Sequence, residues 1–167
     1  MIPLRMESLE VFYAKDRFVS IGAEDIAELK RLAARAPRRR CRVCFHASPK
    51  AAFHEMLIVH ERDAWIPPHK HVGKDESIHV IEGSAMLIGF SESGKTESAV
   101  RIGAGGAVYT RIPSNFYHTL LIDSDWLVFH EATTGPFDRS RTKVAPWGLS
   151  IEGPESERFI QNLRRNL

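Results

Sequence analysis

Residues 67–83 read PPHKHVGKDESIHVIEG, and this stretch decides the fold. His69 and His71 are two positions apart, so in an extended segment both imidazoles leave the same face. Glu76 follows a polar turn and begins the next predicted strand. Gly83 closes that strand, because a residue without Cβ can turn the chain there. The stretch therefore predicts two imidazoles and one carboxylate that converge on a common point.

The fourth predicted ligand lies far along the chain. Residues 113–118 read PSNFYH and open a strand that carries His118. Imidazole and carboxylate suit Zn, Fe, Ni or Mn, and three histidines with one glutamate leave coordination positions open for water or substrate. Such an open site is typical of catalytic rather than structural metals. We therefore predict one divalent transition metal ion at His69, His71, Glu76 and His118.

The other histidines are expected to lie outside this metal site. His79 is three residues after Glu76, and this odd spacing places it on the opposite face of the strand. It is the first substitute should Glu76 not bind. Core or surface positions are expected for the remaining four histidines: His46, His54, His60 and His130.

The segment from residue 40 to residue 132 predicts an all-β barrel or sandwich. Short β-rich runs recur about every ten residues, with turn residues between them. The predicted strands are Cys41–His46, Glu55–His60, Ala64–Pro67, Ser77–Glu82, Ala85–Phe90, Ser98–Ile102, Ala107–Ile112, Tyr117–Ile122 and Trp126–Glu131. A further short strand is expected at Glu10–Tyr13.

Two helices flank the predicted strands. Residues 24–36 place Ile26, Leu29, Leu32 and Ala33 on one stripe at helical spacing, and Pro37 ends the helix. A shorter amphipathic helix is expected at about residues 155–165. We predict one domain over residues 1–167, with an N-terminal extension (1–37), a barrel core (40–132) and a C-terminal loop and helix (133–167).

The composition excludes several classes of protein. A net charge of +2 gives no basis for a nucleic-acid partner, and no apolar stretch approaches the length of a membrane span. No secretory signal is recognisable, so we expect a cytoplasmic protein without a membrane partner. The run Arg38–Arg40 is interpreted as a solvated boundary between a helix and a strand.

One motif is rejected as a functional site, and a second is interpreted as two free thiols, with a redox or metal-binding pair as the minority alternative. Residues 89–96 (GFSESGKT) match the phosphate-loop pattern, but an alternating strand follows them where that motif needs a helix. We interpret Ser91–Gly94 as a hairpin turn between antiparallel strands. Cys41 and Cys44 form a CxxC, yet on a strand they face opposite sides, so we expect two reduced thiols.

The chain resembles the cupin superfamily at these residues. His69, His71, Glu76 and Gly83 have the spacing of the first cupin motif. Pro113, Asn115 and His118 are similar to the second, with Asn115 where glycine is usual. Further segments resemble the WbuC family of cupin-fold metalloproteins: RVCFH at 42–46, KDESIHVIEG at 74–83, GPFD at 135–138 and APW at 145–147.

This resemblance implies a double-stranded β-helix, or jelly roll, that holds the metal inside the barrel. It also implies a bacterial protein of surface-polysaccharide metabolism, with a small sugar-derived or carboxylate substrate, and a homodimer. No settled reaction comes with it, and a dioxygenase or an isomerase are both compatible. Tyr109 and Arg111 are candidate substrate-binding residues, although Arg111 has an equal alternative as a surface ion-pair partner.

Two other functions stay open. A non-catalytic module would use the same metal to bind a small molecule, without turnover. A metal-free sugar isomerase or epimerase would use a histidine base in the barrel, and four candidate ligands at cupin spacing argue against it.

Overall fold

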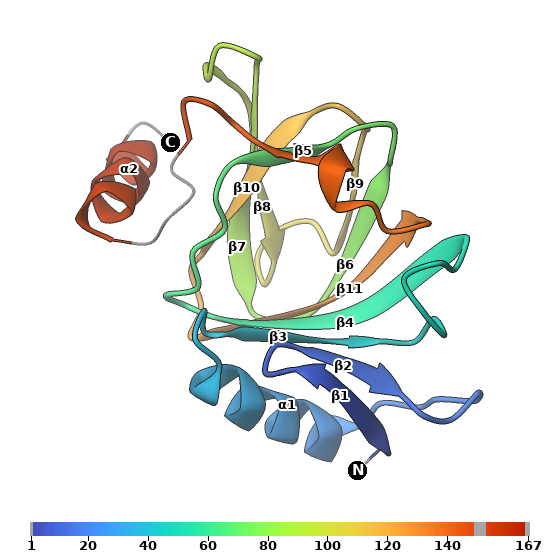
Figure 1. Ribbon diagram of the computed structural model, residues 1–167. Helices are drawn as coiled ribbons and strands as arrows, with labels where there is room; N and C mark the ends of the chain where they lie inside the picture. Colours follow the sequence, from blue (N-terminus) through green and yellow to red (C-terminus); the bar gives the residue numbers. More distant parts are fainter. Residues whose placement is uncertain (1, 149–152, 166–167) are drawn as a thin grey trace.

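Two mainly antiparallel sheets enclose the centre of the molecule, and one helix lies against the outer side of each (Figure 1). The computed structural model describes residues 2–148 and 153–165. The predicted all-β jelly-roll barrel with an N-terminal helix and a short C-terminal helix is confirmed. Neither helix in these residues is long and apolar enough to cross a membrane.

The larger sheet has seven strands in the order β1-β2-β3-β4-β11-β6-β9. Only β2 and β3 run parallel; their neighbours pair antiparallel. The bounds are β1 Leu4–Ser8, β2 Val11–Ala14, β3 Arg40–Cys44, β4 Phe53–Glu61, β6 Glu76–Glu82, β9 Tyr109–Ile112 and β11 Trp126–Thr134.

The smaller sheet has five strands in the order β12-β5-β10-β7-β8, and all its pairs are antiparallel. The bounds are β5 His69–His71, β7 Ser84–Phe90, β8 Thr96–Gly103, β10 Tyr117–Ile122 and β12 Thr142–Val144. The antiparallel β7–β8 pair confirms the hairpin predicted at Ser91–Gly94. A strand, β8, follows the phosphate-loop match where a nucleotide site would need a helix.

The barrel core lies between the two sheets. Side chains alternate along each strand, so every second residue points inward. On β11 these are Leu127 and Phe129, which are fully buried with Ile78 of β6 and Leu120 of β10. Burial of this apolar surface is the main stabilising contribution to the barrel.

Helix α1 (Ala23–Arg35) covers the outer face of the larger sheet. Leu29 and Ala33 pack against Cys41 and Val43 of β3 and against β4. Strand β3 is therefore buried on both faces. Cys41 faces the helix and Cys44 faces the barrel core, which confirms their opposite orientation, and both thiols are free.

Helix α2 (Pro154–Arg165) lies against the smaller sheet. Ile160 and Leu163 pack on a cluster that contains Phe90, Tyr117 and Trp147. Residues 149–152 and 166–167 of the predicted C-terminal segment lie outside the described residues.

The strand predicted at Ala64–Pro67 is wrong, since residues 64–68 form no strand. Pro67 and Pro68 lack the N–H that a strand ladder requires. The buried Thr119 hydroxyl donates instead to the carbonyl of Ile66. Three short strands are absent from the predicted set, β1, β5 and β12, although His69 and His71 are expected to lie in an extended segment. Strand β12 bears directly on the candidate site.

Candidate metal centre

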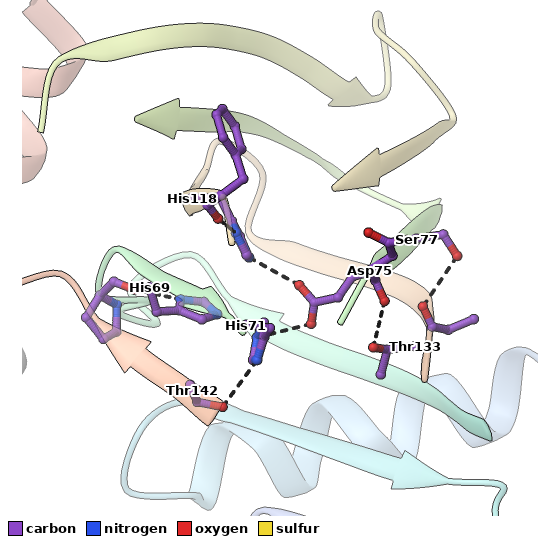
Figure 2. A network of polar contacts seen from close by, with 11 residues as sticks. His69, His71, Asp75, Ser77, His118, Thr133 and Thr142 are labelled. Carbon is purple, nitrogen blue, oxygen red and sulfur yellow. Dashed lines mark hydrogen bonds and ion pairs between the residues drawn. The ribbon is translucent and has the colours of Figure 1, made fainter. Parts of the chain in front are cut away.

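Three histidine side chains from two neighbouring strands point toward a common space (Figure 2). His69 and His71 come from β5 and His118 from β10. One ring nitrogen of each lies within 4.8 Å of the others. The register pairs His118 directly with His69, and their ring centroids are 4.6 Å apart.

Glu76, the remaining predicted ligand, lies beside these imidazoles at the first position of β6. One carboxylate oxygen lies 3.1 Å from Nε2 of His71, and the other lies 3.4 Å from Nε2 of His118. The side chain is buried. The Thr133 hydroxyl on β11 donates to the carbonyl of Asp75, which fixes the start of β6 (Figure 2).

A hydrogen bond at the opposite ring nitrogen orients each imidazole. Nδ1 of His69 lies 2.9 Å from the carbonyl of Pro67, and Nδ1 of His118 lies 3.0 Å from that of Phe116. Nδ1 of His71 contacts the Thr142 hydroxyl at 3.2 Å. Partners of this kind hold the rings of metal-binding histidines and direct Nε2 at the ion.

The donor set fits a cation. A carbonyl only accepts, so Nδ1 of His118 must carry the proton, and the neutral ring then has a lone pair at Nε2. That lone pair faces an oxygen of Glu76, which also accepts when ionised. Two acceptors repel each other unless a metal ion or a proton lies between them.

Burial acts on every ionisable group of the set. Desolvation lowers the pKa of His69 and of His71 to about 3, with help from the neighbouring imidazoles. It also lowers the pKa of His118 and raises that of Glu76. The imidazoles are thus neutral at physiological pH, which is the form that binds metals.

The centre opens into a cavity of about 690 Å³ inside the barrel. Lys74 and Glu131 are among the charged residues that line it and that sequence reasoning missed. Lys74 is buried beside Glu76, and desolvation raises the pKa of Glu131. Alternation contained a signal for Glu131, because it follows Leu127 and Phe129 on the inward face of one strand.

The two candidate substrate-binding residues lie elsewhere. Tyr109 and Arg111 are exposed on β9. Thr110, between them, is partly buried, and Ile112, which follows, lies in the core. Arg111 donates to the carboxylate of Asp75 at 2.6 Å. The structure therefore places Arg111 in a surface ion pair and does not bring either residue to the candidate metal ligands.

The remaining histidines divide between the two faces. His79 is exposed on the outer face of β6, away from Glu76. His54 and His60 are buried and line the cavity, and the ring of His54 stacks on that of His46 at 3.9 Å. His130 lies 3.6 Å from Glu55 on the outer face.

Comparisons with known proteins agree on the fold. The capsular polysaccharide assembling protein CapF from Staphylococcus aureus is similar over 65% of this chain and 32% of its own, with 15% identity and a TM-score of 0.53. The coconut allergen cocosin matches 65% of this chain and 29% of its own, with 17% identity and a TM-score of 0.51. This chain has the cupin fold.

A Shewanella oneidensis protein matches 60% of the chain and 65% of its own length, with 13% identity and a TM-score of 0.50. The present chain thus spans about a third of CapF and under two thirds of the Shewanella protein. Residues 21–102, from just before α1 to β8, match a domain of unknown function, DUF6016. No curated protein sequence matches the chain. The candidate metal centre lies inside a cupin barrel.

Proposed function

We propose that the protein binds one divalent transition metal ion (Zn, Fe, Ni or Mn) through His69, His71, Glu76 and His118. We further propose that it acts as a metalloenzyme on a small molecule held in the barrel cavity. The convergence of three neutral imidazole nitrogens within 4.8 Å, beside a buried carboxylate, is the observation that supports this most strongly.

The ligand set supports an open site. Three imidazoles and one carboxylate leave room for water or substrate, and the adjoining cavity supplies space for it. A metal in this position would act as a Lewis acid or lower the pKa of bound water. The chain would contribute neutral, pre-oriented imidazoles. The apolar side chains that line the cavity would lower the local dielectric constant and so strengthen electrostatic interactions.

The proposed substrate is a sugar-derived acid of bacterial surface-polysaccharide metabolism. Two resemblances support this: the sequence likeness to the WbuC family, and the shared fold of CapF, which is named for capsular polysaccharide assembly. Both are arguments by analogy, because one fold can carry many functions. A cytoplasmic homodimer is the proposed form of the protein, to be checked by sedimentation and cell fractionation.

Elemental analysis of protein purified without added metals tests the metal. We expect about one transition metal ion per chain, and loss of most of it in His71→Ala. His79→Ala removes an imidazole from the outer face and should retain the metal. A wild-type protein without metal that also fails to take up Zn²⁺, Fe²⁺, Ni²⁺ or Mn²⁺ would refute the proposal.

Turnover separates an enzyme from a binding module. A dioxygenase predicts iron occupancy and oxygen consumption with substrate, whereas an isomerase works with a redox-inert metal and no oxygen. Metal-dependent binding of sugar acids with no product by mass spectrometry would favour the non-catalytic alternative.

A further inference from the structure

The Arg42 side chain lies on the inward face of the barrel, although alternation along the strand alone predicts that it faces solvent. It is the central residue of β3, flanked by Val11 of β2 and Ile58 of β4 in the register. Ile58 belongs to the barrel core, and the partly buried Val11 packs against it. The Arg42 side chain lines the same cavity as the candidate metal ligands.

The guanidinium of Arg42 makes no direct hydrogen bond or ion pair among residues 2–148 and 153–165, although its charge acts on the Glu131 carboxyl and opposes the rise in pKa that burial causes there. Its Nε is buried without a hydrogen bond, and the side chain forms no ion pair there. Neighbouring arginines differ: Arg39 pairs with Glu61 at 3.0 Å, and Arg62 with Asp125 at 2.8 Å. Arg42 is thus an inward cation without a counter-ion in contact.

Arg42 as a whole is partly buried, and its Nε is fully buried. Leaving that atom without a partner is costly unless something binds there. Arginine does not lose its proton in proteins, so Arg42 cannot escape the cost by neutralising. A buried polar group without a partner destabilises the folded state. Residues of this kind persist where a ligand supplies the missing partner, and a guanidinium matches the two oxygens of a carboxylate.

The register places Arg42 and Glu76 on the same sheet, at separate positions along the wall of the cavity. Three strand steps separate β3 from β6, and Arg42 lies two inward-facing rows beyond Glu76. At about 4.8 Å per strand and about 3.3 Å per residue, their Cα atoms are roughly 20 Å apart along the sheet. Both side chains shorten this gap, yet a ligand of several carbon atoms is needed to span it.

Charge in the cavity favours an anion. The cavity is lined by five cationic side chains and five carboxylates, so their formal charges cancel: Arg38, Arg40, Arg42, Lys74 and Arg139 against Glu7, Glu10, Glu76, Glu131 and Asp138. A divalent ion at the imidazoles would add positive charge that no described side chain balances, so a negatively charged ligand completes the site.

We propose that Arg42 binds the carboxylate of an elongated acid, such as a sugar acid, whose other end reaches His69, His71 and His118. This assignment rests on the proposed function and names the residue that would bind the acid group of its substrate. It replaces Arg111, which lies on the outer surface, as the anion-binding arginine.

Calorimetric titration with matched acid and neutral probes tests the assignment. The pairs are glucuronate with glucose, gluconate with sorbitol, and succinate with 1,4-butanediol; inorganic phosphate serves as a non-carboxylate anion. We expect at least one acid to bind wild type at least about tenfold more tightly than its neutral partner and than phosphate. Arg42→Gln should abolish this preference, whereas Arg111→Gln, a surface control, should keep it.

Thermal unfolding without ligand provides a second, independent measurement. If Arg42 were purely structural, Arg42→Gln would lower the melting temperature. If the guanidinium is kept for a ligand, Arg42→Gln should leave the melting temperature unchanged or raise it. Unchanged acid binding in Arg42→Gln, no acid binding by wild type, or tighter binding of phosphate than of every acid would overturn the assignment. A lowered melting temperature in ligand-free Arg42→Gln would also overturn it.

Titrations of both metal-loaded and chelator-treated protein separate the two proposals. If the protein holds no metal but the metal-free form still prefers acids through Arg42, the proposed metal function fails and the Arg42 assignment stands. If Arg42→Gln retains the acid preference while metal content is normal, only the Arg42 assignment fails.

Discussion

His69 and His118 occupy directly paired positions on β5 and β10, although they are far apart in the sequence. Each ring is held by a backbone carbonyl two residues earlier in its own strand region, that of Pro67 and of Phe116. The same local arrangement thus occurs on both sides of the pair. Strand register, rather than loop conformation, brings the predicted ligands together.

The Thr142 hydroxyl should matter for metal affinity, because it is the group that orients His71. Thr142→Val keeps the shape and removes this contact, and we expect about a tenfold loss of Zn²⁺ affinity in competition with a chromophoric chelator. Thr96→Val, an exposed substitution on β8, is the control. Equal affinity in Thr142→Val and wild type would show that this contact does not position His71.

Acid should destabilise the metal-free protein through His60. Burial lowers its pKa from 6.5 to about 3, so between these values only the unfolded chain takes up the proton. This destabilisation is absent well above pH 6.5 and grows as the pH falls. At pH 5 the folded state has lost about 2 kcal/mol of stability relative to high pH.

His60→Leu should therefore lose about 2 kcal/mol less than wild type in free energy of unfolding between about pH 7.5 and pH 5. Urea denaturation of chelator-treated protein at both pH values measures this difference. His79→Gln, on the outer face, serves as the matched surface variant. If the free energy of unfolding of His60→Leu fell with pH as steeply as that of wild type, His60 would not be a source of the acid destabilisation.

Glu76 should have opposite effects on stability with and without metal. Burial raises the pKa of its carboxyl, so the folded metal-free state binds a proton that the unfolded chain releases above about pH 4.5. Stability from this group is present at low pH and is lost as the pH rises through the folded pKa. At about pH 8, metal-free Glu76→Gln should be more stable than metal-free wild type, by roughly 1 kcal/mol or more.

Saturating Zn²⁺ should reverse that order, because wild type retains the carboxylate ligand and gains more from binding. Melting curves with chelator and with Zn²⁺ test both parts. An identical ranking of the two proteins under both conditions would exclude Glu76 from the metal site.

Asn115 should tolerate glycine but not a branched side chain. Its φ of 63° lies in the left-handed region, and its N–H donates to the carbonyl of His71 at 2.9 Å. We expect Asn115→Val to cost about 1–2 kcal/mol and Asn115→Gly to stay within about 0.5 kcal/mol of wild type. Urea denaturation measures both, and a neutral valine would contradict the backbone argument.

Much of the fold could be predicted from alternation and turn residues. Strand β10 has the predicted bounds, Tyr117–Ile122, because turn residues flank it on both sides, PSN at 113–115 and DSD at 123–125. Gly83 also has the expected role: its φ is 86°, and a Cβ there would lie 2.0 Å from the carbonyl oxygen of Trp126. Short strands such as β12 escaped prediction, since three residues contain no periodic signal and depend on their partner strand.

The candidate site divides in the same way. His69, His71, Glu76 and His118 have a recognisable spacing, and the fold brings them together. Arg42 has the opposite pattern, because Cys41 and Val43 mark the apolar side of β3 and leave the arginine on the apparently polar side. Sequence could not show that α1 covers that apolar side, which turns the polar side into a cavity wall.

Strand β5 carries two of the proposed ligands, and its outer edge is paired with β12, near the C-terminal end of the chain. During synthesis on a ribosome, residues 69–71 emerge long before Thr142–Val144 can join them. The nascent protein would then contain all four ligands but not the strand that steadies them. Metal loading should therefore be a late step, completed after translation has delivered the last barrel strand.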